Sequence, residues 1–330
     1  MSTLRRAWLV VTLHGCGAAS GSSPAVRDTE SVETATTTEE HAGSVAPKTP
    51  PAAPQTTPAL PEAVTAPGPS APTSCGAHGC LRFASPVDAF EHVLAEEPLV
   101  LAVGEMHQLA DREGVASAVH HFTKELLPRL KGRASDLVLE LWVADPGCAR
   151  EVAKVDEAQT EIRAGQAAEN QNEYVALGDE AKRLGIQPTV LEPTCDDYRA
   201  IAAAGDDGAI LMLQTIARLT TNKVTALVDK HRLREKQPIV VCYGGAIHND
   251  LDPTKSAASF SYGPALAKRF GRRYIALDLI VPELITDNKL WRSQPWRDDY
   301  DPAAHPDETI LFHPRDGEYA LIFAPSSPNP

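Results

Sequence analysis

Ionisable side chains follow three aliphatic stretches of the chain. Two short motifs have the form Gly-x-x-His, Gly104-Glu105-Met106-His107 and Gly245-Ala246-Ile247-His248, and a third stretch, Leu137-Val138-Leu139, runs directly into Glu140. Imidazole and carboxylate are the groups that proteins use for general acid–base catalysis and for binding divalent cations. The candidate site therefore comprises four residues: Glu105, His107, Glu140 and His248.

Two imidazoles and two carboxylates that meet in one cleft suit three kinds of chemistry. His107, His248 and Glu140 can hold a divalent cation, which lowers the pKa of a bound water. Without a metal, a histidine oriented by a glutamate can act as a general base toward water. Alternatively, one histidine holds a haem iron, and the acidic groups are then structural. The spacing along the chain does not separate these alternatives.

The sequence around these residues predicts alternating strands and helices. We expect strands at 99–103, 137–139, 188–191, 239–243 and 274–281. Their continuous apolar runs indicate strands covered on both faces. We expect helices at 87–96, 114–130, 148–184 with a break, 207–229 and 262–270, and Gly185 and Gly271 stand where C-caps are expected. This alternation predicts an α/β fold, with a mainly parallel sheet flanked by helices.

The end of the chain predicts a different kind of pairing. Thr309–His313 and Tyr319–Phe323 are separated by Pro314-Arg315-Asp316-Gly317-Glu318, which is typical of a hairpin. We therefore expect an antiparallel C-terminal hairpin on the sheet. Residues 75–330 have the length of a single domain of this class.

A parallel sheet would bring the four candidate residues together, because the carboxyl ends of its strands meet at one edge, where ligands bind. The glycine of each Gly-x-x-His motif is expected to let the backbone turn sharply after its strand. Glu192 also follows a predicted strand, and it either joins the site or pairs with a neighbouring arginine.

The first residues have the layout of an export signal. Arg5 and Arg6 precede the short apolar run 7–13, and Leu13-His14-Gly15-Cys16 follows. The segment resembles a bacterial lipoprotein signal, which implies a signal peptide at 1–15, a lipidated Cys16 and a lipid-anchored domain in the bacterial cell envelope. The alternative is an accidental apolar start with a lone cysteine.

The next segment, 16–74, is predicted to be a disordered tether. It is rich in Ala, Ser, Thr, Glu and Pro, with nine prolines between Pro47 and Pro72 and no aromatic residue. Such a composition buries too little apolar surface to offset the entropy of ordering the chain. The tether would hold the domain away from the membrane surface.

The remaining cysteines suggest a disulfide. Cys75 and Cys80 lie in a tight loop, and in an oxidising compartment they can form a small disulfide or, with His78, bind a metal. Cys242 sits in an apolar run and is expected to be a buried small hydrophobe. Cys148 and Cys195 have no assignment.

The net charge of the chain argues against a nucleic-acid partner. The chain has 31 Lys and Arg against 44 Asp and Glu, a net charge of −13, which excludes the basic footprint of a nucleic-acid-binding protein. No apolar stretch reaches the ~20 residues that span a bilayer as a helix. We therefore expect no nucleic-acid partner and no integral membrane domain.

The motifs at Glu105, His107, Glu140 and His248 resemble those of the superfamily that includes ChaN-like haem-binding lipoproteins, erythromycin-esterase-like enzymes and the TraB/Tiki group. The resemblance implies an α/β fold with these residues lining one pocket. It implies haem binding, ester hydrolysis by an activated water or metal-dependent peptidase activity, according to the branch.

Details of the sequence favour different branches. His120-His121 resembles the paired histidines of the ChaN-like group, which implies a haem site at His107, His120 and His121. Arg112-Glu113 resembles the esterase pattern instead. In the alternative interpretation, His120 and His121 belong to a helix that turns at least one of them toward the core.

Our leading hypothesis is a lipid-anchored hydrolase, with or without a divalent metal, acting on a small molecule or peptide. His107 would be the base or a ligand, Glu105 and Glu140 would orient it or bind metal, and His248 would be a second ligand or stabilise the transition state. The alternatives are a haem- or iron-binding uptake lipoprotein without turnover, and an inert descendant that keeps the fold.

Two further segments have more than one interpretation. Trp291 and Trp296 either cover a pocket as a mobile lid or pack across the sheet edge. Asp196 and Asp197 after Thr194 predict a helix N-cap.

Overall fold

The structure is a computed structural model that describes residues 12–14, 72–112, 114–163 and 165–326. Most of the predicted signal peptide and tether, including Cys16, therefore lies outside the described residues. Two short pieces are described: β1 (Thr12–His14), which pairs in parallel with residues 141–143, and β2 (Thr73–Ser74). In the described part of the chain, no helix is long and apolar enough to span a membrane.

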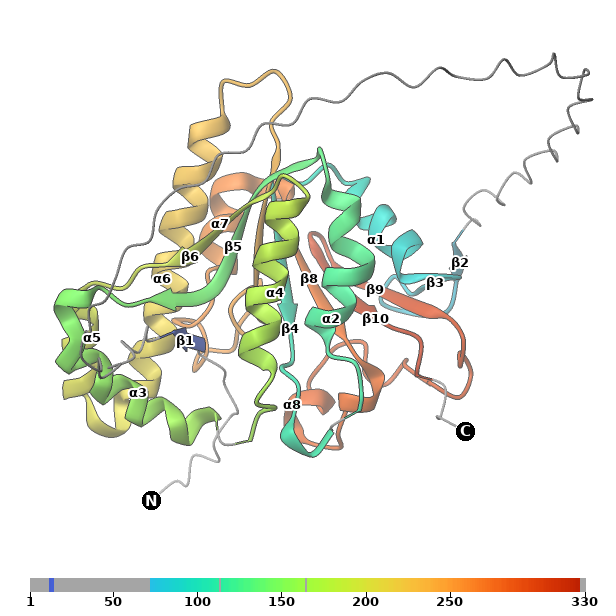
Figure 1. Ribbon diagram of the computed structural model, residues 1–330. Helices are drawn as coiled ribbons and strands as arrows, with labels where there is room; N and C mark the ends of the chain where they lie inside the picture. Colours follow the sequence, from blue (N-terminus) through green and yellow to red (C-terminus); the bar gives the residue numbers. More distant parts are fainter. Residues whose placement is uncertain (1–11, 15–71, 113, 164, 327–330) are drawn as a thin grey trace, which may run out of the picture. The chain divides into compact units, whose positions relative to one another are not determined.

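A ten-stranded sheet forms the centre of the domain, in the order β1-β5-β7-β4-β8-β10-β9-β3-β2, with β6 paired to β5 (Figure 1). Its parallel strands are β4 (Val100–Glu105), β5 (Ala134–Val143), β6 (Gln187–Leu191), β7 (Ile239–Gly245) and β8 (Tyr274–Ile280). Every residue of β4 and β7 is buried, as their continuous apolar runs predict. The predicted α/β class with a mainly parallel sheet is confirmed.

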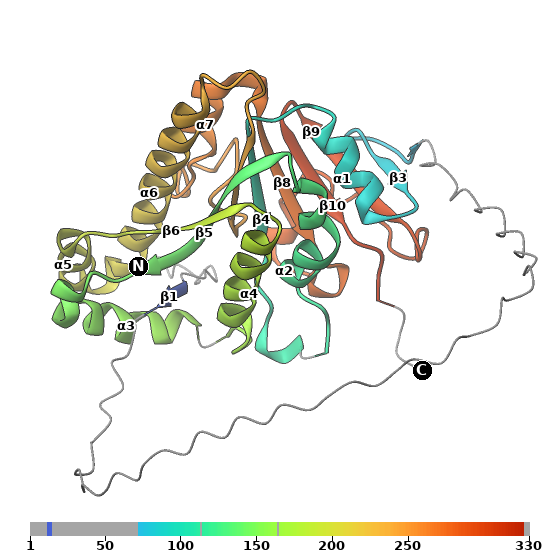
Figure 2. The ribbon, with the colours of Figure 1, turned by 45° about the horizontal axis from the view of Figure 1, so that its top comes forward.

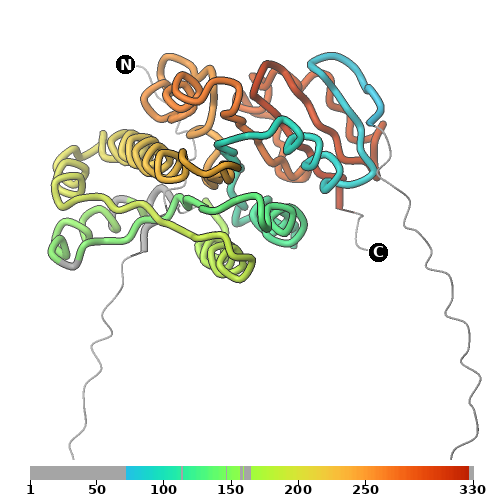
Figure 3. The backbone as a smooth tube through the Cα atoms, turned by 90° about the horizontal axis from the view of Figure 1, so that it is seen from above, coloured from blue at the N-terminus to red at the C-terminus, as the bar shows by residue number. Residues whose placement is uncertain are grey.

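Helices cover both faces of the sheet (Figures 2 and 3). Their bounds are α1 (Pro86–Leu94), α2 (Ala118–His121), α3 (Ala149–Arg163), α4 (Asn170–Arg183), α5 (Cys195–Ala203), α6 (Gly208–His231), α7 (Gly263–Phe270) and α8 (Lys289–Arg292). Alternate strand residues face opposite layers: Val103 packs in a core with Tyr174 of α4, whereas Ala102 packs in a second core with Met212 of α6.

The predicted helix at 114–130 is shorter and irregular. It begins only at Ala118, because the side chain of Ser117 caps it by accepting a hydrogen bond from the backbone N–H of His120. A π-helical turn over Phe122–Leu126 and a 3₁₀ turn over Leu127–Leu130 complete the segment. The predicted break in 148–184 falls between α3 and α4, and Gly185 and Gly271 have the positive φ of helix C-caps.

The predicted antiparallel hairpin is confirmed as β9 (Thr309–Arg315) and β10 (Glu318–Ile322). Strand β3 (Leu81–Phe83) extends the sheet antiparallel to β9. Trp291 and Trp296 are buried in a small core over these strands, and Trp296 stacks on Phe312. This burial supports the interpretation in which they pack across the sheet rather than form a lid.

The described residues contain two disulfides. Cys75–Cys80 closes the predicted tight loop, which overturns the alternative of a metal site there, and Cys242 is free and buried as predicted. Cys148–Cys195, which the sequence left unassigned, joins the segment before α3 to the first residue of α5.

The two disulfides close loops of different length, so their removal should destabilise the domain to different extents. The Cys148→Ala/Cys195→Ala variant should lose about 4 kcal/mol of unfolding free energy, because the bond restricts a loop of 47 residues in the unfolded chain. Urea unfolding measures this loss. The matched variant Cys75→Ala/Cys80→Ala, with a separation of 5, should lose only about 2 kcal/mol. Equal losses in the two variants would contradict this account.

Candidate functional site

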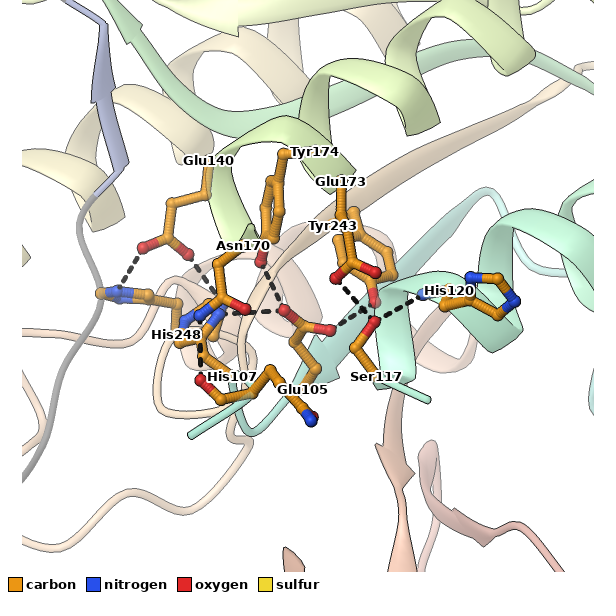
Figure 4. A network of polar contacts seen from close by, with 12 residues as sticks. Glu105, His107, Ser117, His120, Glu140, Asn170, Glu173, Tyr174, Tyr243 and His248 are labelled. Atoms are coloured by element: carbon orange, nitrogen blue, oxygen red, sulfur yellow. Dashed lines mark hydrogen bonds and ion pairs between the residues drawn. The ribbon is translucent and has the colours of Figure 1, made fainter. Parts of the chain in front are cut away.

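The four candidate residues converge at the carboxyl ends of β4, β5 and β7 (Figure 4). Glu105 ends β4 and His107 follows it, Glu140 lies in β5, and His248 comes three residues after β7. Their exposed fractions are 4%, 8%, 5% and 1%, so all four are buried. The structure thus brings together side chains that are up to 143 positions apart (248 − 105).

Glu105 accepts three hydrogen bonds. Its Oε1 is 2.9 Å from Nδ1 of His107 and 3.0 Å from the hydroxyl of Tyr174, and its Oε2 is 2.7 Å from the hydroxyl of Tyr243. Burial and the neighbouring Glu105 charge raise the pKa of both tyrosines well above its usual value, so the two hydroxyls keep their protons and donate. A carboxylate is the form that accepts from all three donors.

The contact with Glu105 determines which nitrogen of His107 is free. We assign the proton to Nδ1, since it faces the Glu105 carboxylate, and Nε2 then carries a lone pair. Nε2 is buried and has no hydrogen-bond partner among the described residues. A Cβ added at Gly245 would lie 3.3 Å from this nitrogen, so the lone pair lies close to the β7 end.

Both nitrogens of His248 face acceptors. Nδ1 is 2.6 Å from the carbonyl oxygen of Phe260, and Nε2 is 3.3 Å from Oε1 of Glu140. Burial opposes the charged ring, but the Glu140 carboxylate and the Phe260 carbonyl outweigh it and raise the pKa of His248. The other oxygen of Glu140 accepts a hydrogen bond of 2.8 Å from the backbone N–H of Gly245.

The glycines of the motifs serve a purpose other than the predicted sharp turn. Gly104, Gly244 and Gly245 lie within β4 and β7, and none has a positive φ. A Cβ at Gly244 would collide with the Glu140 carboxylate, and one at Gly104 would lie 2.6 Å from Oδ1 of Asp278. These positions therefore need glycine because buried side chains pass against the backbone.

A second buried contact lies behind the cluster. Asn249, the residue after His248, donates hydrogen bonds to Asp278 Oδ1 and to the carbonyl oxygen of Ala102. Burial raises the pKa of Asp278 to about 7, although the Asn249 hydrogen bond opposes this rise. Asn249 thus ties the loop that carries His248 to β4 and β8.

The two predicted haem ligands beyond His107 have their contacts elsewhere. His120 is exposed and lies beyond Ser117 from Glu105 (Figure 4). Nδ1 of His121 is 2.6 Å from Glu125, and its ring stacks on Phe323 at 4.4 Å between centroids. Neither ring is fully buried in the core, and the structure does not assemble the predicted set of His107, His120 and His121.

The predicted metal ligands also lack the spacing of a ready metal site. Among the described residues, the one group of three potential ligands within 4.8 Å of one another is Asp145, Cys148 and Cys195, whose two cysteines form the disulfide. Nδ1 of His248 is bound to the carbonyl oxygen of Phe260, and its Nε2 has no hydrogen bond among the described residues beyond the ion-pair distance of 3.3 Å to Glu140. His107, His248 and Glu140 therefore do not form a group of three ligand atoms at this spacing, and a shared divalent cation at these residues stays a prediction.

Other predicted positions lie outside the cluster. Glu192 is an exposed partner of Lys223, at 3.1 Å, rather than of an arginine. Thr194 caps α5, and Asp197 completes the capping box, as the N-cap prediction requires.

Two tyrosines and a neighbouring acid belong to the cluster but were not predicted from the sequence. Tyr243 stands two residues before the second Gly-x-x-His motif, and its position near the end of a predicted strand could have indicated that it belongs to the cluster. Tyr174 comes from α4, and no spacing rule links it to Glu105. Beside it, Glu173 accepts a hydrogen bond from Ser117, and burial raises the pKa of Glu173.

The Glu140–His248 contact predicts a measurable titration. Glu140→Gln removes the negative charge that holds the second proton on His248, so the His248 pKa should fall and the ring should lose its charge at a lower pH. NMR titration of the histidine ring protons measures this shift. Glu125→Gln, beside His121, is the matched control and should leave His248 unchanged. An unaltered His248 titration in Glu140→Gln would contradict the assignment.

Comparisons with known proteins identify no family. No model of a protein family and no curated protein matches the chain. Among solved structures, a Bacillus cereus protein has 10% identity and a TM-score of 0.33, over 73% of this chain and 93% of its own. A succinoglycan biosynthesis protein has 13% identity and a TM-score of 0.19, over 59% of this chain and 62% of its own. At these scores, neither similarity carries an argument about fold or function.

Proposed function

We propose that the domain is a hydrolase in which His107, oriented by Glu105, takes a proton from water. One observation carries the proposal: Nε2 of His107 is buried and lacks a hydrogen-bond partner in the described chain, while Nδ1 is bound to Glu105. A histidine held in this tautomer by a carboxylate is the usual form of a general base. The resemblance of the motifs to the erythromycin-esterase-like enzymes supports the same chemistry.

The residues divide the reaction as follows. The attacking water gives a proton to Nε2 of His107 while its oxygen bonds to the carbonyl carbon of an ester or amide. The carbonyl oxygen becomes an oxyanion, which the positive charge of His248 favours. Collapse of this intermediate breaks the bond to the leaving group, and the leaving group takes the proton from His107. Glu105 accepts the hydrogen bond from Nδ1 of His107 and thereby stabilises the charged ring.

The rings of His107 and His248 lie near the same glycine, which supports their joint action. A Cβ at Gly245 would lie 3.3 Å from Nε2 of His107 and 3.8 Å from Cδ2 of His248. The rings of His107 and His248 therefore both lie close to Gly245. Because the site is buried, its electrostatic interactions are stronger than they would be in water.

The unpartnered nitrogen also favours a second candidate function. A lone pair on a buried imidazole can bind a haem iron, so a haem- or iron-binding lipoprotein without turnover is the alternative. This candidate rests on His107 alone, because His120 and His121 have contacts elsewhere.

His107→Ala should lower the hydrolysis of p-nitrophenyl esters or of a fluorogenic peptide about 100-fold or more, because it removes the base. Steady-state rates measure the loss, and circular dichroism confirms the fold. His120→Ala is the matched control, because it removes an exposed histidine of a neighbouring element and should keep full activity.

Titration with haem distinguishes the two candidate functions. A shifted Soret band that disappears in His107→Ala, in a protein without hydrolytic activity, would replace the hydrolase with the binding protein. Hydrolysis that survives in a folded His107→Ala variant would exclude His107 as the base.

We also propose that the domain is anchored by lipid in the bacterial cell envelope, on the basis of residues 1–16. In a bacterial host, the full chain should incorporate radiolabelled palmitate and fractionate with membranes, and Cys16→Ala should do neither. The Cys75→Ser/Cys80→Ser variant controls for the other cysteines and should remain labelled. Membrane attachment of Cys16→Ala would refute the anchor.

A further inference from the structure

A hollow of about 660 Å³ lies at the opposite end of the sheet from the candidate site. It is bordered by the amino ends of β5, β6 and β7 and by the end of α6, at the top of Figure 1. None of the hydrolytic residues borders it. The volume falls within the range of roughly 300–1,000 Å³ that is typical of small-molecule sites.

Cations dominate the charge around this hollow. Lys131, Lys230 and Arg234 border it, and none of them forms an ion pair within the described chain. Asp136 is the single acid in the lining, and it already binds His231 and the hydroxyl of Ser135. The lining therefore carries a local excess of positive charge in a chain whose net charge is −13.

A buried histidine in the lining has one unused nitrogen. His231, the last residue of α6, is 4% exposed, and its Nε2 is 2.8 Å from Oδ2 of Asp136. Its Nδ1 is buried and has no hydrogen-bond partner among the described residues. The contact with Asp136 fastens α6 to β5, but it leaves Nδ1 unexplained, and an unsatisfied buried nitrogen costs free energy.

We propose that this hollow binds a phosphorylated small molecule. The three cations would neutralise a phosphate group, which carries up to two negative charges and several acceptor oxygens. His231 borders the hollow, so a phosphorylated ligand bound there would change the surroundings of its ring. A bare phosphate would leave most of the volume empty, and Leu184 and Pro238 provide apolar lining for the uncharged remainder of the ligand.

Calorimetric titration of the full chain with adenosine monophosphate, adenosine and inorganic phosphate tests the proposal. Adenosine monophosphate should bind, and adenosine should not, because the cations recognise the phosphate. Rising salt should weaken the binding. Histidine side-chain NMR spectra should show the His231 signals moving as adenosine monophosphate is added.

The chain offers a control with the same change in charge. Lys230→Ala/Arg234→Ala removes two lining cations and should weaken binding at least about tenfold. Arg232→Ala/Lys236→Ala removes two cations of the same segment that do not border the hollow, and should change binding less than about twofold. The proposal is overturned if adenosine binds as well as its monophosphate, if both variants weaken binding equally, if the His231 signals stay fixed, or if no phosphate compound binds.

Discussion

The candidate site depends on one buried carboxylate. Burying the charge of Glu105 is unfavourable unless its oxygens accept hydrogen bonds, and three donors meet this need. The donors come from the loop after β4, from α4 and from β7, so the charge ties three parts of the fold together. The same arrangement leaves His107 with one tautomer and an unpartnered Nε2. The availability of Nε2 of His107 as a base is thus a consequence of the hydrogen bonds that stabilise the buried Glu105 carboxylate.

The position of the Glu140 carboxylate depends on the absence of a side chain at Gly244. The ladder between β5 and β7 ends at Leu139 and Tyr243, and beyond it Oε2 of Glu140 accepts the N–H of Gly245. The pairing of β5 with β6 shifts register between Leu139 and Trp142, on the segment that carries Glu140. Glycine at 244 leaves the space that the Glu140 carboxylate occupies.

The sequence predicted the features that follow from local pattern. Apolar runs located the parallel strands, and the convergence of their carboxyl ends located Glu105, His107, Glu140 and His248. Contacts between distant segments could not be predicted from local pattern. Tyr174 reaches the cluster only because α4 packs there, and the Cys148–Cys195 disulfide forms only because α5 approaches α3. The predicted haem ligands His120 and His121 do not join His107, because two adjacent histidines on a helix point in different directions and need not face it. Periodicity also missed the late start of α2, which one hydrogen bond to Ser117 determines.

Strand β5 links the two ends of the domain. It carries two buried acids, Asp136 and Glu140, four residues or about 13 Å apart along an extended strand. Each faces a buried histidine that arrives from a distant segment, His231 from α6 and His248 from the loop after β7. Removing either histidine would leave a buried carboxylate without its ion-pair partner, which costs more than the ion pair contributes. The two buried acids of β5 are therefore stabilised by these two histidines, independently of any ligand at either end of the strand.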